Sequence, residues 1–275
     1  TAGRFAPGLP AKGDGQLLFM LNGLAKLKDD GQMAIIQNGS SLFNGDAGSG
    51  PSEIRRYLIE NDWLDAIVQL PGNAFYNTPI ATYIWIVMKN KPVTHQGKVQ
   101  LIDASACASS RRKNIGEKKV DITKACRDLI IEAYGAYVND TYNGVDENNN
   151  TIVVKSKVMD AVDLGYNKIV VETPQFDEDG NVIMKKKKPV ADTSKRDTEN
   201  VPLAEDIDDY FEREVIPYNP QAWIDKSKTK VGYEIPFTRT FYEYKQIEPS
   251  DVIAARIEEH EKSLMAKLHD LFGGE

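Results

Sequence analysis

Two apolar runs separated by a short aromatic link constrain the fold of this chain most strongly. The runs cover residues 64 to 70 and 81 to 88, and the roughly ten residues between them contain no helical pattern. Parallel neighbours need a crossover of a dozen or more residues, usually with a helix, so this pair is predicted to be antiparallel. The link follows a buried strand, at the position where open α/β sheets build ligand clefts.

Helices and further strands are expected on both sides of this pair. Apolar residues at helical spacing predict one helix, with Asp14 as its N-cap and Gly31 as its left-handed stop. Pro51 marks the start of a second. The helices are expected at residues 15 to 29 and 51 to 61, and additional strands at 33 to 36, covered on both faces, and at 99 to 102. The sheet is therefore predicted to be mixed, in an α/β fold.

The character of the sequence changes near residue 104. The remaining expected elements are a basic stretch at 111 to 119, a helix at 122 to 138, a surface loop at 139 to 151, a hairpin joining 169 to 171 with 182 to 184, and a short helix around 205 to 214. We divide the chain into residues 1–103, 104–248 and 249–275.

The last predicted element is a helix over residues 250 to 272. One stripe of this helix carries the apolar residues Ile257, Leu264, Leu268 and Leu271. Such a stripe requires a partner surface, either within its own domain or in a bundle with another subunit, and the periodicity fits both.

Composition narrows the class of protein. The chain has 275 residues, of which 41% are hydrophobic and 27% charged, as is ordinary for a globular protein. Its longest apolar stretches, of about eight residues, fall short of the roughly 20 that a membrane span needs, so no membrane partner is expected. Cys107 and Cys126 lack zinc-ligand spacing, which fits a reducing cytoplasm and predicts neither disulfide nor metal. The net charge of −7 implies that any nucleic-acid contact is local or shared.

Several separated segments resemble one known family. They include GQLLFMLNGLAKLKDDGQMAIIQNGSSLF, GDAGSGPSEIRRYLIENDWLDAIVQLP, FYNT, TYIWIV, GKVQLIDAS and SKVMDAVDLGYNKIVVETP. These resemble the methylation (M) subunit of type I restriction-modification systems, an adenine-N6 DNA methyltransferase. The resemblance implies the C-terminal part of a Rossmann-like methyltransferase sheet with an antiparallel strand pair, followed by a mixed region with a β-hairpin and a C-terminal α-helix. It also implies S-adenosylmethionine as cofactor, and DNA, a specificity subunit and a restriction subunit as partners.

The resemblance also indicates what the 275 residues lack. The family's glycine-rich cofactor motif and its Asn-Pro-Pro-Phe or Tyr tetrapeptide lie upstream of the matching segments, and no Asn-Pro-Pro occurs in this sequence. The chain also begins at Thr1 without a Met, which suggests a true N-terminus further upstream. We therefore expect that the chain by itself does not methylate DNA.

The resemblance assigns roles to residues in the link and in the first helix. Phe75 matches an aromatic position that stacks on the extruded adenine, and Tyr76 and Asn77 follow it, able to contact base or phosphate. Phe19 matches a position near the cofactor's adenine, and Asn38 ends the first strand on the cleft side. The alternatives are structural: Phe75 as an aromatic plug at the end of the sheet, and Phe19 as a core residue.

Two basic stretches receive different interpretations. The first, matching a basic stretch of the family, suits phosphate contact without sequence readout, although a solvated charge run is an equal alternative. It comprises Arg111, Arg112, Lys113, Lys118 and Lys119. The second, residues 185 to 188, is interpreted as a solubility feature.

Two other functions remain as alternatives. One is a non-catalytic interaction module that binds a specificity subunit or DNA. The other, an unrelated nucleotide-binding enzyme, would need a phosphate loop, and GDAGSG lacks the Gly-Lys-Ser/Thr ending. The resemblance also implies that a different polypeptide, the specificity subunit, reads the DNA target.

Overall fold

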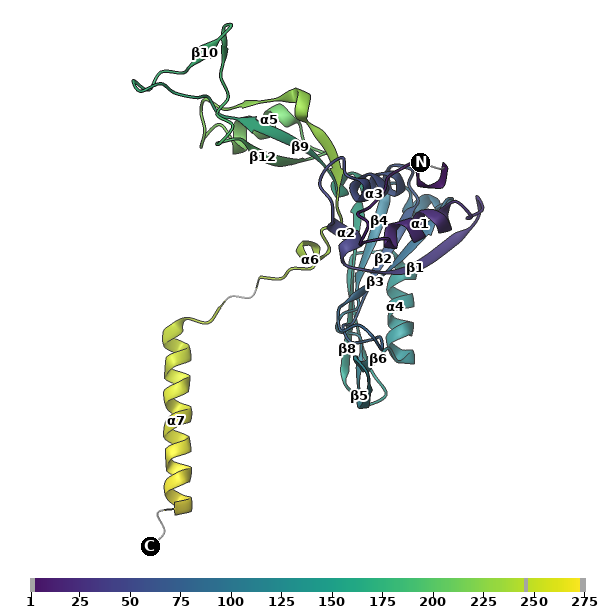
Figure 1. The fold of residues 1–275 in the computed structure, drawn as a ribbon. Helices are drawn as coiled ribbons and strands as arrows, with labels where there is room; N and C mark the ends of the chain where they lie inside the picture. The colour runs from purple at the N-terminus through teal and green to yellow at the C-terminus, as the bar shows by residue number, and fades with distance from the viewer. Residues whose placement is uncertain (1–2, 245–246, 273–275) are drawn as a thin grey trace. The chain divides into compact units, whose positions relative to one another are not determined.

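The structure is a computed structural model that describes residues 3–244 and 247–272 (Figure 1). The chain divides into two compact units, one ending at Phe241 and the other beginning at Tyr242. We describe each unit by itself.

The first unit is built on a six-stranded mixed sheet. Its strand order is β1-β3-β2-β4-β8-β7. The strands are β1 (Gln32–Asn38), β2 (Leu64–Leu70), β3 (Thr82–Met88), β4 (Lys98–Asp103), β7 (Asp140–Val145) and β8 (Thr151–Asp160). β3 runs antiparallel to both β1 and β2, and β4 runs parallel to β2. The predicted antiparallel pair and the mixed sheet are therefore confirmed.

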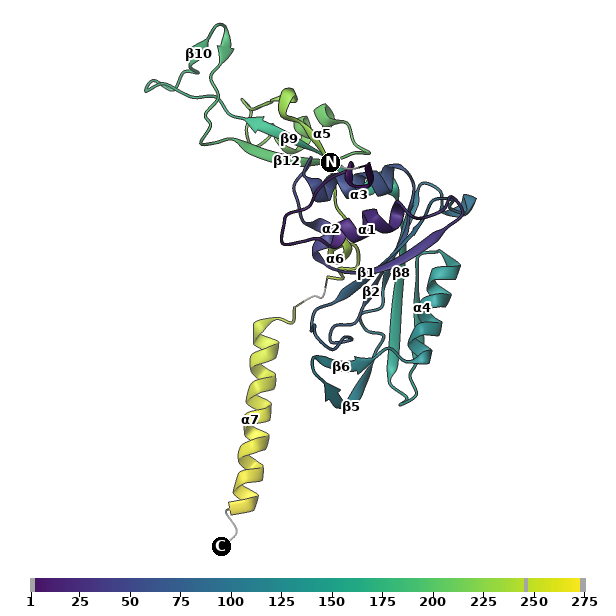
Figure 2. The same cartoon turned by 45° about the vertical axis from the view of Figure 1, so that its right-hand side comes forward.

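Helices cover both faces of this sheet (Figure 2). They are α1 (Gln16–Leu24), α2 (Ser40–Phe43), α3 (Gly50–Glu60) and α4 (Lys124–Ala136), with short 3-10 turns at Gly3–Phe5, Val93–His95 and Ala161–Leu164. Because side chains alternate along a strand, β3 supplies Trp85 to a core with α1 and α3, and its neighbour Ile84 to a core with α4. Burying one large apolar side chain stabilises the fold by about 1.5–3 kcal/mol.

A buried arginine fixes the loops beside α3. Arg55 donates to the backbone carbonyls of Tyr233, Ser41 and Asn44 at 2.6, 3.1 and 2.9 Å. Burial lowers the pKa of its guanidinium to about 10, so it still carries its charge at neutral pH. One side chain thus joins α3 to residues 41–44 and to Tyr233, which is 178 positions away in sequence.

The N-terminal helix differs from the prediction. α1 ends at Leu24 instead of residue 29, and Gly31 is not in the left-handed region. Two tight turns follow, and Leu27 packs against the first core instead of extending the helix. Asp14 does not cap α1, because its carboxylate accepts hydrogen bonds from the side chains of Gln16 and Ser40.

Strand β1 also differs from the prediction, since it is not covered on both faces. It lies at the edge of the sheet, where β3 is its partner, and Ile36 is exposed. An edge strand presents unpaired backbone groups on its outer side.

The segment predicted as a surface loop at 139 to 151 is wrong in large part. It contains β7 and the start of β8, joined by a tight turn, and β8 pairs with β4. β7 is an edge strand with mostly exposed side chains, which explains its loop-like composition. The predicted division of the chain at residues 103 and 248 stays a prediction.

The predicted hairpin near residue 180 is correct at its turn and wrong in its pairing. Phe176 bridges to Val182 around a turn with Gly180 at φ +80°. Residues 169 to 171, however, belong to β9, which pairs with β12, β13 and β14, because strands from further along the chain complete a second sheet. The elements of this region are β9 (Gly165–Glu172), β10 (Met184–Lys185), β11 (Lys188–Pro189), β12 (Asp197–Pro202), α5 (Ile207–Glu214), β13 (Trp223–Ile224), a 3-10 turn at Lys226–Lys228, β14 (Lys230–Tyr233) and α6 (Phe237–Thr240).

The second unit contains one helix, α7 (Ser250–Phe272). Its bounds agree with the predicted C-terminal helix. The four stripe residues Ile257, Leu264, Leu268 and Leu271 are 42–75% exposed.

Candidate nucleic-acid interface

The link between β2 and β3 is an ordered loop, which we call the aromatic loop (residues 71–80). The amide of Asn73 donates to the carbonyl of Pro79 at 3.0 Å, and Phe75 forms a bridge with Thr78. Asn73 itself has φ +57°, a left-handed conformation that asparagine tolerates. The loop therefore closes on itself at the end of β2.

The predicted stacking residues differ in burial. Phe75 is half-buried and packs against the core on the α4 side of the sheet. Tyr76 is 64% exposed, and Asn77 is also exposed. Partial burial of Phe75 is compatible with both predicted roles, an aromatic plug at the end of the sheet and a ring that stacks on the extruded adenine.

A basic hairpin packs onto the aromatic loop. It consists of β5 (Ser109–Ile115) and β6 (Lys118–Asp121), and we call residues 109–121 the basic hairpin. The amide of Lys119 donates to the carbonyl of Asn73, and the amide of Glu117 donates to the carbonyl of Tyr76, both at 2.9 Å. The side chain of Asn73 returns a bond to the carbonyl of Glu117 at 3.1 Å. Two predicted groups that are distant in sequence are thus joined by their backbones.

Gly116 makes this close approach feasible. It has φ +57°, and a Cβ at this position would lie 2.5 Å from the carbonyl oxygen of Tyr76. A side chain would therefore meet both backbone strain and a steric clash. The sequence analysis missed this glycine, although a Gly inside a run of charged residues is a typical turn signal.

The far end of the basic hairpin is anchored by a buried carboxylate. Asp146, in the turn between β7 and β8, accepts a hydrogen bond from Ser109 Oγ. It also accepts bonds from the amides of Asn148 and Asn150 at 2.9 and 2.8 Å. These bonds, that from Ser109 above all, hold the pKa of Asp146 at about 2. The hairpin is therefore fixed at its turn and at its base.

The cations of the basic hairpin fall into two groups. Arg111 and Lys118 both pair with Asp121, Lys118 at 3.1 Å, and the hydrogen bond from Arg111 is the main cause of the lowered pKa of Asp121. Lys118 Nζ also lies 5.7 Å from the centre of the Tyr76 ring, within cation–π range. A second group forms no ion pair with any residue that the structure describes: Arg112, Lys113 and Lys119.

The register of the sheet brings Asn38, one of the two predicted cofactor residues, to the same edge as the aromatic loop. Asn38 pairs with Thr82, and Thr82 pairs with Leu70 on its other side. Strands lie about 4.8 Å apart, so the ends of β1 and β2 are about 10 Å apart. The carboxyl ends of β1, β2 and β4 meet here, as at the ligand clefts of α/β sheets.

Asn38 and Phe19 lie in different surroundings at this edge. Asn38 Oδ1 accepts hydrogen bonds from Gln16 Nε2 at 2.7 Å and from the amide of Ser40 at 2.9 Å. Phe19 is 70% exposed, so the alternative of a core residue is wrong for the part of the chain that the structure describes. It stands three residues after Gln16 on α1 and therefore shares that helix face.

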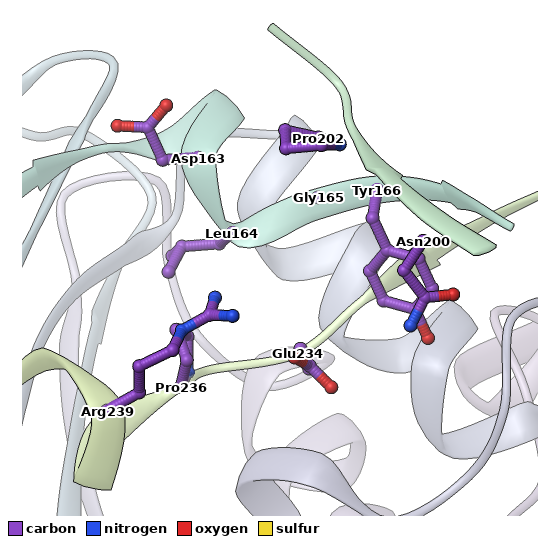
Figure 3. A pocket seen from close by; sticks show the side chains of 9 residues that line it. All are labelled: Asp163, Leu164, Gly165, Tyr166, Asn200, Pro202, Glu234, Pro236 and Arg239. Carbon is purple, nitrogen blue, oxygen red and sulfur yellow. The ribbon is translucent and has the colours of Figure 1, made fainter. Parts of the chain in front are cut away.

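A separate pocket of about 120 Å³ lies beside the second sheet (Figure 3). Glu234 and Arg239 are among the side chains that line it, and none of the predicted site residues does. Ligand pockets usually have about 300–1,000 Å³, so this one is too small for a nucleobase with its sugar or for S-adenosylmethionine.

Within residues 3–244 and 247–272, no group of three or more His, Cys, Asp or Glu side chains is placed to hold a metal ion. Cys107 and Cys126 are buried free thiols, and burial raises the pKa of Cys107 to about 12. In the same residues, no helix has the length and apolar character to span a membrane.

Comparison with known proteins decides the family. A family model described as N-6 DNA Methylase matches residues 1–175, which include the aromatic loop and the basic hairpin. The chain belongs to the N-6 DNA methylase family. The resemblance inferred from the sequence is thereby confirmed.

Individual relatives match smaller parts of the chain. The type I restriction enzyme MjaIX methylase subunit of Methanocaldococcus jannaschii is 31% identical over 109 residues, 39% of this chain and 19% of that protein. The HindI methylase subunit of Haemophilus influenzae is 33% identical over 101 residues, 37% of this chain and 22% of that protein. The chain thus spans about a fifth of the length of these curated relatives.

A solved structure is similar as well. The methyltransferase subunit of a type I restriction-modification system from Streptococcus thermophilus is 27% identical, with a TM-score of 0.47. The match covers 59% of this chain and 31% of that one.

Proposed function

We propose that this chain forms part of a type I restriction-modification DNA methyltransferase subunit, which transfers a methyl group from S-adenosylmethionine to N6 of adenine. In this proposal the aromatic loop receives the target base and the basic hairpin receives the adjacent phosphates. The observation that carries it is the set of hydrogen bonds that join the two, made between backbone groups and by the side chain of Asn73. Membership of the N-6 DNA methylase family supports it.

The aromatic loop would hold an extruded adenine. The amino group of a paired adenine is out of reach inside a duplex, so the base must be flipped out at a cost of a few kcal/mol. Stacking on an aromatic ring returns about 1–3 kcal/mol. Phe75 is suited to this role because the core fixes part of its ring, and the exposed Tyr76 and Asn77 can contact base or phosphate.

The basic hairpin would hold the DNA backbone. Arg112, Lys113 and Lys119 are exposed and have no acidic partner among the described residues, so their charges are available to phosphates. Arg111 and Lys118 are already paired with Asp121, and in this proposal they mainly stiffen the hairpin. Such contacts position the duplex without reading its sequence.

Phe19 and Asn38 would contribute to the cofactor site. An exposed phenyl ring at the carboxyl edge of the sheet fits stacking on the adenine of S-adenosylmethionine, which supplies the methyl group when bound. Asn38, whose side chain and amide are both bonded to Gln16, would shape the same edge through its fixed backbone. Because the sequence contains no Asn-Pro-Pro, we propose that this chain alone shows no turnover with labelled S-adenosylmethionine.

The exposed stripe of α7 favours a subunit contact in addition. A helix of 23 residues with no buried side chain in the described unit can bury its apolar stripe against helices of a specificity subunit. Replacing Leu264 and Leu268 with Glu should then abolish co-purification with that subunit. Unchanged co-purification would contradict the docking. If the chain is instead a non-catalytic interaction module, it should dock to the specificity subunit but show no preference for DNA with an unpaired adenine.

Binding to an unpaired adenine tests the role of the aromatic loop. The full chain should bind a duplex with one unpaired adenine more tightly than a fully paired duplex. Phe75→Ala should reduce this preference by about 5–150-fold, the equivalent of about 1–3 kcal/mol of stacking. Phe75→Trp should retain it, and Phe272→Ala, which removes an exposed ring in the second unit, should not alter it. Equal binding of both duplexes by the unmodified chain would refute the proposal.

A further inference from the structure

We propose that a second basic turn, separate from the interface above, is a contact for the phosphates of duplex DNA. This turn comprises Lys185, Lys186, Lys187 and Lys188, and we call it the lysine turn. It lies outside the residues that the family model matches. That the bound anion is DNA rests on the proposed function.

The backbone of the lysine turn is unusual for its sequence. Lys185 pairs with Lys188, so Lys186 and Lys187 are the two central residues of a tight hairpin. Both have positive φ, 51° and 64°. Such turns strongly prefer Asn and Gly, and a left-handed conformation costs other residues about 1–2 kcal/mol each. Strained backbone of this kind is often found at ligand clamps and other functional sites.

The four charges of the lysine turn are not neutralised. All four lysines are exposed, and none forms an ion pair with a carboxylate in the described part of the chain. Four positive charges at one hairpin repel each other, and a bound polyanion would reduce this repulsion by neutralising them. Lysine acts on phosphate as a point charge, which suits contact with a DNA backbone irrespective of sequence.

An ordered arm (residues 173–196) carries the lysine turn. Pro174 bridges to Ala191, and the amide of Val190 donates to the carbonyl of Ile183 at 2.9 Å. At the base of the arm, Arg196 pairs with Glu172 of β9 at 2.8 Å. The charges of the lysine turn are therefore held on a structured support.

Three of the four acidic residues of the arm are gathered at a different turn. Asp177, Glu178 and Asp179 lie at the turn around Gly180, and Asp177 Oδ1 accepts bonds from the amides of Asp179 and Asn181. None of these three acids pairs with the lysine turn in the described part of the chain, and the fourth acid of the arm, Asp192, pairs with Lys195 near the base at 3.7 Å. The four lysines of the turn therefore keep their charges available.

DNA fits this surface better than an acidic protein. A duplex carries one negative charge per 1.7 Å of axis, a density that a folded acidic protein does not reach. Protein interfaces depend on aromatic and arginine anchors, and the lysine turn offers neither at its tip. The net charge of −7 means that the rest of the chain repels a duplex, which increases the value of a local cationic cluster.

The test measures how salt weakens binding of the full chain to a short duplex of random sequence. One variant changes all four lysines of the turn to Gln. A control changes four exposed lysines elsewhere, Lys12, Lys26, Lys28 and Lys267, to Gln and so has the same net charge. Each lost phosphate contact reduces the slope of log affinity against log salt by about 0.9. We expect the slope to fall by about 2–4 and the affinity at low salt by roughly tenfold or more in the turn variant, with less than about threefold loss of affinity in the control.

Three results would overturn the proposal. These are equal behaviour of variant and control, absence of duplex binding by the unmodified chain at low salt, and loss of binding to polyglutamate without loss of duplex binding. The last result would assign the turn to an acidic protein.

The outcome is independent of the test on Phe75. If the slope depends on the lysine turn but no preference for unpaired adenine exists, the lysine turn binds DNA and the role proposed for the aromatic loop fails. If the preference exists and the slope does not depend on the turn, the lysine turn proposal fails alone.

Discussion

The basic hairpin and the lysine turn are similar in sequence and different as physical objects. Both are short β-hairpins rich in cations. The basic hairpin is bonded to the aromatic loop at one end and to Asp146 at the other, and two of its cations are paired with Asp121. The lysine turn has strained backbone, and its charges have no ion-pair partner among residues 3–244 and 247–272. The comparison teaches that a basic run can either position a neighbouring site or offer its charge directly to a ligand.

The largest expected effect comes from Gly116→Ala, which should detach the basic hairpin. The new Cβ would meet the carbonyl of Tyr76 at 2.5 Å in a left-handed backbone, at a cost of about 2–4 kcal/mol. Gly180→Ala is the matched control, because Gly180 also has positive φ but open space around it, and should cost about 1 kcal/mol. Urea unfolding measures both. Equal costs would mean that the hairpin does not depend on this close approach.

Asp146→Asn should loosen the base of the hairpin in a pH-dependent way. A carboxylate whose pKa falls from 3.8 to about 2 on folding stabilises the protein fully above about pH 4, and this stability is lost as the pH falls toward 2. The melting temperature of the wild-type chain should therefore exceed that of the variant at pH 6, and the difference should vanish near pH 2.

Asp225→Asn provides the control for this experiment. The pKa of Asp225 is also about 2, chiefly because of its hydrogen bond with Lys228, but it does not contact the hairpin. Hydrogen exchange at the amides of Glu117 and Lys119 should accelerate in the Asp146 variant and stay unchanged in the Asp225 variant. Faster exchange in both would show that the anchor is not specific.

A smaller, stabilising effect is expected when the lysine turn is given its preferred residues. Lys186→Asn with Lys187→Gly should slow hydrogen exchange at the amides of Ile183 and Val190 by the equivalent of about 1–2 kcal/mol, because the left-handed strain at both positions is relieved and the folding entropy of the new glycine offsets part of the gain. Lys185→Asn with Lys188→Gly removes the same charges without relieving that strain. Similar exchange in the two double variants would contradict the strained-turn interpretation.

The smallest expected effect is on the paired cations of the basic hairpin. Asp121→Asn should release Arg111 and Lys118 and raise affinity for a duplex about threefold, while stability changes by less than about 1 kcal/mol. Asp128→Asn makes the same charge change on α4, where its partner is Lys124, and should have little effect on binding. Lower affinity in the Asp121 variant would show that hairpin rigidity matters more than available charge.

Local chemistry allowed much of the fold to be predicted. Pro51 and the apolar spacing after it marked α3, and the ten-residue link marked β2 and β3 as antiparallel. The C-terminal helix was predicted with its observed bounds, since its stripe is uninterrupted. These features depend on residues close together in sequence.

Pairing between distant segments was predicted less well. β7 reads as a loop because an edge strand with exposed side chains has the composition of one. β9 was predicted to pair with the nearest apolar run, residues 182 to 184. In the structure it pairs with β12, β13 and β14 instead. Short-range hairpin signals carry no information about strands that arrive later in the chain.

The sequence by itself determined the local elements, the family and the residue types available for contact with a base and with phosphates. Tertiary structure decided that the aromatic loop and the basic hairpin form one surface, and that Asp146 and Gly116 hold it together. The physical reason is that these junctions are made mainly of backbone amides and carbonyls, which are the same at nearly every residue. Side-chain patterns record burial and periodicity, and they do not record which carbonyl a given amide will meet.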